Sequence, residues 1–264
     1  MTAPRARLDA ELVRRGLARS REQACELVTA GRVAVAGQPA SKPATQVARD
    51  ASITVRDTGD PGYVSRGGYK LAGALQVFGD LVVAGRHCLD AGASTGGFTD
   101  VLLRAGAAHV VAADVGYGQL AWSLRTDPRV TVMDRVNVRT IGHVVPVPDL
   151  VVADLSFISL TLALPALVAC ATPDADFVLL VKPQFEVGKG RVGPGGVVRD
   201  TTDRSAAVER VSGAAAQLGL GVQGITASPL PGPAGNVEYF LWLRRGAPPL
   251  DGGQLQRAIE EGPD

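Results

Sequence analysis

The sequence predicts an α/β protein in which a small N-terminal domain precedes a doubly wound, largely parallel sheet. Apolar strand segments alternate with helical patterns up to residue 244, residues 1–56 hold ten Lys and Arg against five Asp and Glu, and TGDPG at 58–62 has the composition of a linker. The expected units are therefore an N-terminal domain over 1–57, a linker over 58–64, a second domain over 65–246 and a C-terminal tail over 247–264.

Composition indicates a globular protein of the cytoplasm. Of the 264 residues, 46% are hydrophobic, which is enough for a buried core. The apolar run at 160–171 is too short to cross a bilayer, and no signal peptide is recognisable. The three cysteines, Cys25, Cys88 and Cys170, are widely spaced, so we expect neither a disulfide framework nor a metal site.

The N-terminal segment has the pattern of two helices followed by short strands. Apolar positions recur at helical spacing, and β-type segments follow, which predicts helices over 8–17 and 20–31 and strands over 32–41 and 52–57. This arrangement resembles the RNA-binding αL domain of a small-subunit ribosomal protein. The resemblance implies phosphate contacts from Arg5, Arg7, Arg19 and Arg21. The alternative is that these arginines only solubilise the domain.

The second domain contains seven apolar strand segments, separated for the most part by helical patterns. A helix is expected over 65–78, and the strands over 87–91, 109–115, 130–134, 149–155, 176–182, 220–228 and 237–243. Seven strands is the number found in the common methyltransferase fold that uses S-adenosyl-L-methionine (SAM).

A glycine-rich turn follows the first of these strands, in the sequence HCLDAGASTGGFTD at 87–100. Glycines allow the backbone to approach a ligand, and the N–H groups of the next helix point toward it. The turn departs from the dinucleotide pattern GxGxxG because Ser94 stands at the second glycine, while Asp90 before the turn suits a cationic amino-acid group. Both features favour SAM over NAD, so the expected cofactor-binding residues here are Asp90, Gly92, Ala93, Ser94, Thr95, Gly96, Gly97 and Phe98.

Further polar residues lie at the carboxyl ends of strands, where an open α/β sheet binds its ligand. Asp114 ends the second strand, 24 residues after Asp90, where a carboxylate can accept hydrogen bonds from ribose hydroxyls. Tyr117, Gly118, Asp134 and Asp154 complete the expected cofactor site.

Lysine is rare here, since the chain has 23 arginines and only four lysines. A lysine can lose its proton in a suitable environment, whereas a guanidinium effectively cannot. Lys182 and Asp154 each follow a strand, Glu238 lies in the last strand segment, and Lys70 lies in the helix before the first. The order Lys70, Asp154, Lys182, Glu238 resembles the catalytic tetrad of RNA ribose 2′-O-methyltransferases.

The whole chain resembles the TlyA family, rRNA methyltransferases also labelled haemolysin A. The resemblance rests on SRGGYKL, CLDAGASTGGFTD, AADVGYGQLAW, VVADLSFISL, LVKPQFEVGKG and SPLPGPAGNVEYFLWL. It implies SAM as donor and methylation of cytidine ribose in 16S and 23S rRNA of the ribosomal subunits. On the second domain, the candidate RNA contacts are Arg66, Arg135, Lys189 and Arg191. The alternatives are an RNA-binding or haemolytic protein without methyl transfer, and an NAD-dependent oxidoreductase.

Overall fold

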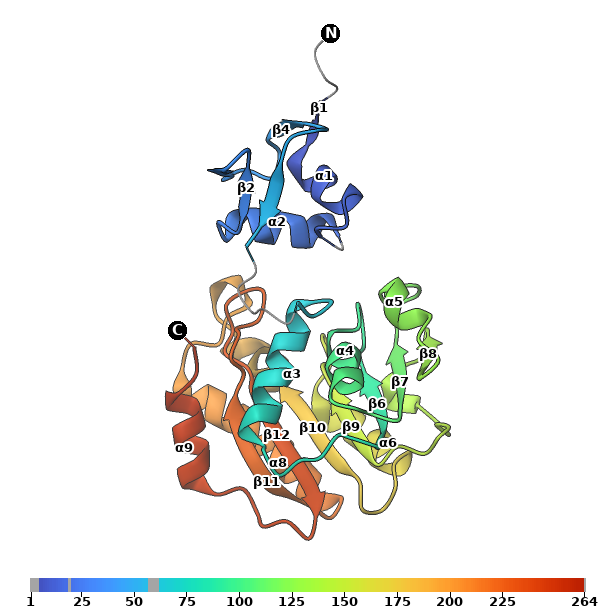
Figure 1. Cartoon of the computed structure of the whole chain (residues 1–264). Helices are drawn as coiled ribbons and strands as arrows, with labels where there is room; N and C mark the ends of the chain where they lie inside the picture. Colours follow the sequence, from blue (N-terminus) through green and yellow to red (C-terminus); the bar gives the residue numbers. More distant parts are fainter. Residues whose placement is uncertain (1–4, 19, 57–61, 264) are drawn as a thin grey trace. The chain divides into compact units, whose positions relative to one another are not determined.

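The computed structural model describes residues 5–18, 20–56 and 62–263 (Figure 1). The chain divides into two compact units, Met1–Gly62 and Tyr63–Asp264. This division falls within the predicted linker, of which residues 58–61 lie outside the described part. Each unit has a hydrophobic core of its own.

The first unit packs two helices against short strands. Helices α1 (Leu8–Arg14) and α2 (Arg21–Thr29) contact each other, and the Oγ of Ser20 caps α2 by accepting a hydrogen bond from the Gln23 amide at 3.1 Å. A three-stranded sheet has the order β3-β2-β5, and a separate antiparallel pair joins β1 to β4. The strands are β1 (Arg5–Arg7), β2 (Val33–Val35), β3 (Gln38–Pro39), β4 (Gln46–Ala48) and β5 (Ile53–Val55). The pair β1–β4 was not predicted, because three residues are too few to show an alternating pattern.

The second unit is built on a seven-stranded sheet of order β11-β12-β10-β9-β6-β7-β8. Strand β12 is antiparallel to both neighbours, and β6 to β10 pair in parallel. The chain leaves β6 first toward β7 and later toward β9, so the topological switch point lies between β6 and β9. All seven predicted strands form, as β6 (His87–Ala91), β7 (His109–Asp114), β8 (Val130–Asp134), β9 (Leu150–Ala153), β10 (Asp176–Val181), β11 (Leu220–Ala227) and β12 (Tyr239–Arg245).

Helices cover both faces of this sheet (Figure 1). Side chains alternate along β10, so that Val178 and Leu180 join one core while Leu179 and Val181 join the other. The first core includes residues of α3 (Arg66–Val77), α4 (Gly97–Arg104) and α5 (Trp122–Arg125); the second includes residues of α6 (Leu160–Ala169), α8 (Thr201–Gln217) and α9 (Gly252–Glu260). Shorter elements are α7 (Pro183–Glu186), η1 (Val138–Thr140), η2 (Lys189–Arg191) and η3 (Pro194–Gly196).

The predicted tail is wrong as a structural assignment. Residues 247–264 contain α9, whose Leu255, Ala258 and Ile259 are buried against the core and which contacts β11. The apolar positions of this short amphipathic helix bury one face on the sheet, so the segment belongs to the second unit. Among the described residues, no helix is both long and apolar enough to cross a membrane.

Candidate active site

Two of the predicted catalytic residues meet at the carboxyl ends of neighbouring parallel strands. Asp154 follows β9 and Lys182 follows β10, and the Lys182 Nζ lies 2.6 Å from Asp154 Oδ1. The same Nζ donates a hydrogen bond to the Oγ of Ser156 at 2.9 Å. The ion pair and this hydrogen bond together restrict the direction of the Lys182 head group. The sequence analysis did not predict Ser156, because no sequence pattern distinguishes a serine that bonds to a lysine from an ordinary loop serine.

The other two predicted catalytic residues form a second ion pair. Lys70 of α3 donates from Nζ to the Oε2 of Glu238 at 2.5 Å, and their side chains are only 7% and 1% exposed. Glu238 immediately precedes β12. A Cβ atom at Gly232 would lie 2.6 Å from Glu238 Oε1, so the loop backbone closes over this carboxylate. The four residues are therefore arranged as two ion pairs, each with one lysine and one acid.

The glycine-rich turn lies beside the first ion pair. A small cavity of about 120 Å³ is lined by the turn, by the start of α3 and by Asp154: Ser65, Gly67, Gly92, Ala93, Ser94, Thr95, Gly97, Phe98 and Asp154. At Gly92, where φ is +85°, a Cβ would lie 2.5 Å from the carbonyl oxygen of Asp154. A side chain at this position would fill the space between the turn and Asp154, which explains the glycine. Gly96 is not in the cavity wall but faces Leu120 and Leu124.

Asp114 anchors the turn. Its Oδ2 accepts the amide of Ser94 at 2.8 Å, and its Oδ1 accepts the amide of Gly116 at 2.7 Å. Ser94 itself has φ +46°, a left-handed conformation that is uncommon outside glycine. Asp114, at the end of β7, thus stabilises the backbone conformation of the turn.

The remaining predicted cofactor residues gather near the ends of β7 and β8. Asp134 accepts from Arg125 Nη2 at 2.9 Å and from the amide of Gly118 at 3.3 Å. The Arg135 guanidinium lies 4.5 Å from the ring centroid of Tyr117, a cation–π contact on an exposed ring. Arg135, which is expected to contact RNA, therefore stacks on Tyr117, which is expected to contact the cofactor.

Asp90 differs from the others because its side chain is buried within β6. It is fully buried, outside the cavity wall, and its Oδ2 accepts the hydroxyl of Thr99 at 2.6 Å. Burial raises the pKa of this carboxyl to about 7, against a lowering by the Thr99 hydrogen bond. The Thr99 hydrogen bond joins the end of β6 to α4, and the contact of Asp90 with the amino group of a cofactor stays a prediction.

An exposed aromatic ring, that of Phe157, follows Asp154 and Ser156 in the sequence, and the sequence analysis did not predict it. Phe157 is 92% exposed, has φ +65° and packs against Phe185 with ring centroids 5.4 Å apart. Both line a larger cavity of about 550 Å³, whose other wall is the glycine-rich segment 188–196. A bulky residue in a left-handed conformation with an exposed ring is unusual, and such strain concentrates at functional sites.

Glu186 bonds to the N-terminus of α6, two residues after Phe157. It is buried, and it accepts hydrogen bonds from Ser159 Oγ at 2.5 Å and from the Leu160 amide at 2.7 Å. The carboxylate therefore caps the first turn of α6. Burial raises the pKa of Glu186, opposed by the hydrogen bond from Ser159.

The predicted RNA contacts are dispersed over the two units. Arg7 and Arg21 both bond to Asp9, Arg66 donates to the Pro231 carbonyl at 3.4 Å, and Arg191 pairs with Asp203 at 3.2 Å. Arg5 lies in β1 and Lys189 in η2. Arg19 lies outside the described residues.

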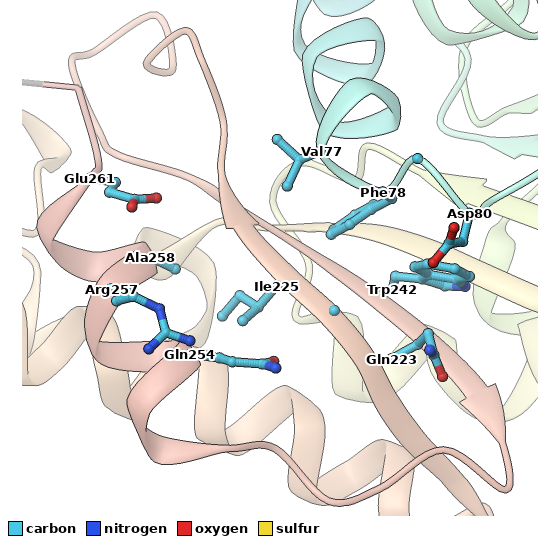
Figure 2. A pocket seen from close by; sticks show the side chains of 12 residues that line it. Val77, Phe78, Asp80, Gln223, Ile225, Trp242, Gln254, Arg257, Ala258 and Glu261 are labelled. Atoms are coloured by element: carbon cyan, nitrogen blue, oxygen red, sulfur yellow. The ribbon is translucent and has the colours of Figure 1, made fainter.

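A third cavity lies away from these residues (Figure 2). It measures about 320 Å³ and is bounded by the end of α3, by β11 and by α9. Its floor includes the aromatic pair of Phe78 and Trp242, with ring centroids 5.6 Å apart. Lys70 lies in the early turns of α3, whereas this cavity begins at its last residue, Val77. None of the predicted site residues lines it, and no cluster of His, Cys, Asp and Glu suited to a metal occurs in the described part.

Comparison with known proteins assigns both units. Residues 63–245 match the FtsJ-like methyltransferases, and residues 6–53 match the S4 domain. The chain belongs to the FtsJ-like methyltransferase family. Within it, the chain is 62% identical to the 16S/23S rRNA (cytidine-2′-O)-methyltransferase TlyA of Mycobacterium tuberculosis over 99% of this chain and 100% of that protein.

Two further proteins are similar over most of the chain. Hemolysin A of Brachyspira hyodysenteriae is 37% identical, with 89% of this chain and 98% of that protein covered. A solved structure from Streptococcus thermophilus, described as a hemolysin, aligns with a TM-score of 0.76 at 38% identity, covering 98% of this chain and 96% of that one. The chain is therefore a TlyA-type methyltransferase with an S4 domain, as the sequence motifs predicted.

Proposed function

We propose that this enzyme transfers a methyl group from SAM to the 2′-hydroxyl of cytidine riboses in 16S and 23S rRNA. The observation that carries the proposal is the Lys182–Asp154 pair, held at 2.6 Å next to a glycine-lined cavity whose wall includes Asp154. The full-length relative from M. tuberculosis carries the same activity in its name. Ribosomal subunits occupy the cytoplasm, which is where we expect this reaction.

The residues around the turn fit SAM. The cavity is smaller than the roughly 300–1,000 Å³ of a whole ligand pocket, so it suits one part of SAM, its amino-acid portion. A Cβ at Gly92 would close the approach to Asp154, and the turn carries no phosphate-binding GxGxxG pattern. Asp114 and Asp134 at the ends of β7 and β8 would hold the ribose and adenine side.

In the mechanism, SAM supplies an electrophilic methyl group on a sulfonium. Lys182, once it has released its own proton to solvent, would orient the ribose hydroxyl and accept the hydroxyl proton while the oxygen takes the methyl group and the sulfonium departs as a neutral thioether. Asp154 and Ser156 hold the Lys182 head group in one direction. Lysine suits this role because its ammonium can lose a proton, whereas guanidinium effectively cannot.

Lys70 and Glu238 shape the site from the other side. Each lysine has a carboxylate partner of its own, so the two ion pairs leave little net charge in the site. Because the Lys70–Glu238 pair is almost fully buried, it is held in place and fixes the start of α3, where Ser65 and Gly67 line the cavity.

The substrate side requires an unstacked nucleotide, since a ribose in folded rRNA must reach the cofactor. The exposed ring of Phe157 offers a stacking surface for a base beside the catalytic pair. The arginines of the S4 domain, together with Arg66, Arg135, Lys189 and Arg191, supply positive charge for the phosphates.

Methyl transfer to purified ribosomal subunits tests this proposal. Radiolabelled SAM is incubated with the enzyme and with small or large subunits lacking the modification, and the rRNA is digested to nucleosides. Label in 2′-O-methylcytidine supports the proposal. No label in either subunit favours the binding-only alternative, and calorimetric binding of NAD without binding of SAM favours an oxidoreductase.

A further inference from the structure

A buried carboxylate organises two arginines of the S4 domain. Asp9 lies in the first turn of α1, and its side chain is only 2% exposed. Its Oδ1 accepts from Arg7 Nε at 3.1 Å and from the Ala10 amide at 2.8 Å, while its Oδ2 accepts from Arg7 Nη2 at 2.7 Å and from Arg21 Nη2 at 3.0 Å. Both oxygens are therefore saturated by well-placed donors.

The two arginines are anchored but exposed. Arg7 is 46% and Arg21 60% exposed, although each bonds to a buried partner. Arg7 uses one edge of its guanidinium for Asp9, and a guanidinium carries more N–H donors than this contact uses. The remaining donors can bind a second acceptor, and phosphate matches their planar geometry.

Asp9 joins elements that are separate in the sequence. Arg7 ends β1 and Arg21 opens α2, so the shared carboxylate fixes the distance between two guanidinium groups from different elements. Without it, both long side chains sample many rotamers, and ordering them on binding costs free energy.

We propose that Asp9 is a positioning residue that holds Arg7 and Arg21 beside one carboxylate, so that their remaining donors can bind rRNA phosphates together. The inference rests on the proposed function, because it assumes an rRNA substrate. The proposal gives an acidic residue a favourable role in RNA binding. Charge alone predicts the opposite role, because a carboxylate repels a polyanion.

The two explanations predict opposite effects of Asp9→Asn. The substitution removes one negative charge, so a purely electrostatic account predicts tighter RNA binding. The asparagine Nδ2 donates and cannot accept from an arginine, so the positioning account predicts weaker binding. Glu11→Gln is the matched control, because Glu11 is a buried acid of the same helix whose partners, Arg14 and Arg15, are outside the predicted RNA contacts.

The experiment measures binding of the full chain to purified 16S rRNA as a function of salt concentration, without SAM. We expect Asp9→Asn to weaken binding about tenfold, close to the value of one charge-assisted hydrogen bond, and to flatten the salt dependence. Glu11→Gln is expected to bind at least as tightly as wild type. Thermal unfolding of each variant ensures that all are folded at the assay temperature.

A second set of variants separates positioning from folding. If Asp9 acts through the arginines, Asp9→Asn has no further effect on RNA affinity in the Arg7→Ala/Arg21→Ala background. Unchanged or tighter RNA binding by Asp9→Asn in the otherwise wild-type chain would overturn the inference. An equal loss of RNA affinity in the Arg7→Ala/Arg21→Ala background would overturn it as well. Methyl transfer by the wild-type chain is measured separately, and its absence would overturn the proposed function while the binding comparison still decides the role of Asp9.

Discussion

The ammonium group of Lys70 lies 2.5 Å from the carboxylate of Glu238, and 168 residues separate the two in the sequence. The pair joins the first helix of the second unit to the residue that precedes its last strand, and both side chains are almost fully buried. A buried ion pair is costly to desolvate, and leaving one charge without its partner costs more. The pair therefore makes the position of α3 depend on both residues.

Breaking the pair on one side should destabilise the protein. We expect Glu238→Gln to lower the free energy of unfolding by about 3–5 kcal/mol, because Lys70 is left buried without a countercharge. Urea unfolding measures this change. The double variant Lys70→Met/Glu238→Leu removes both charges and should be more stable than either single variant. Single variants as stable as wild type would contradict the role of this pair.

Replacing the proposed proton acceptor should remove chemistry without removing cofactor binding. Lys182→Arg keeps a positive charge beside Asp154 but loses the group that can give up a proton. We expect the methyl-transfer rate to fall by about 10²–10⁴-fold, the usual contribution of general acid–base catalysis. Calorimetry with SAM is the control and should show little change in affinity. A rate near that of wild type would exclude Lys182 as the base.

The glycine-rich turn lies so close to Asp154 that a substitution at Gly92 should weaken SAM binding. In Gly92→Ala, the new Cβ would lie 2.5 Å from the Asp154 carbonyl oxygen at φ +85°, so the turn must move. SAM affinity should fall at least about tenfold, as a displaced turn loses the equivalent of one or more hydrogen bonds. Gly85→Ala is the control, since Gly85 has φ +78° but a Cβ there would meet no other atom within 4 Å. Equal SAM affinities for the two variants would refute the steric explanation.

The buried Asp90 predicts a pH dependence of stability. Its pKa is raised from 3.8 to about 7, so the folded chain keeps this proton between about pH 4 and pH 7 while the unfolded chain has lost it. The contribution of Asp90 to stability therefore falls as the pH rises through this range and is constant above it. Asp90→Asn removes this contribution, and its stability relative to wild type should increase from pH 4 to pH 7. A constant difference between the two unfolding curves would show that Asp90 is ionised in the folded state.

The exposed Phe157 predicts a loss of function without a loss of stability. Its ring makes contact with Phe185 but is 92% exposed, so Phe157→Ala should leave the thermal unfolding midpoint close to that of wild type. Loss of one stacked base costs about 1–3 kcal/mol, and we expect KM for ribosomal subunits to rise accordingly. Leu162→Ala, at a half-exposed apolar residue of α6, is the control. An unchanged KM and rate would remove Phe157 from the substrate site.

The sequence predicted β7, β9 and β10 well because each contains an apolar run that leads to a polar residue. Asp114, Asp154 and Lys182 occupy the carboxyl ends of β7, β9 and β10, where the alternation of strands and helices placed them. The pairing within the tetrad was not predictable. It depends on β12 lying next to β10 and on the packing of α3, both of which are long-range arrangements.

Other features depend on local geometry that the residue types do not reveal. Nothing in the sequence distinguishes the exposed, left-handed Phe157 from a core phenylalanine, or shows that the Asp90 side chain is fully buried. The short helix α9 has only three buried apolar residues, which is too weak a pattern to separate from a tail.

Ribose methylation by the Lys182–Asp154 pair is tested most directly by nucleoside analysis of rRNA after reaction with labelled SAM. The wild-type enzyme is predicted to place label in 2′-O-methylcytidine from both subunits, and Lys182→Arg is predicted to place almost none while still binding SAM. Label on a cytosine base, on another nucleoside, or at equal levels with Lys182→Arg would contradict ribose methylation by the Lys182–Asp154 pair.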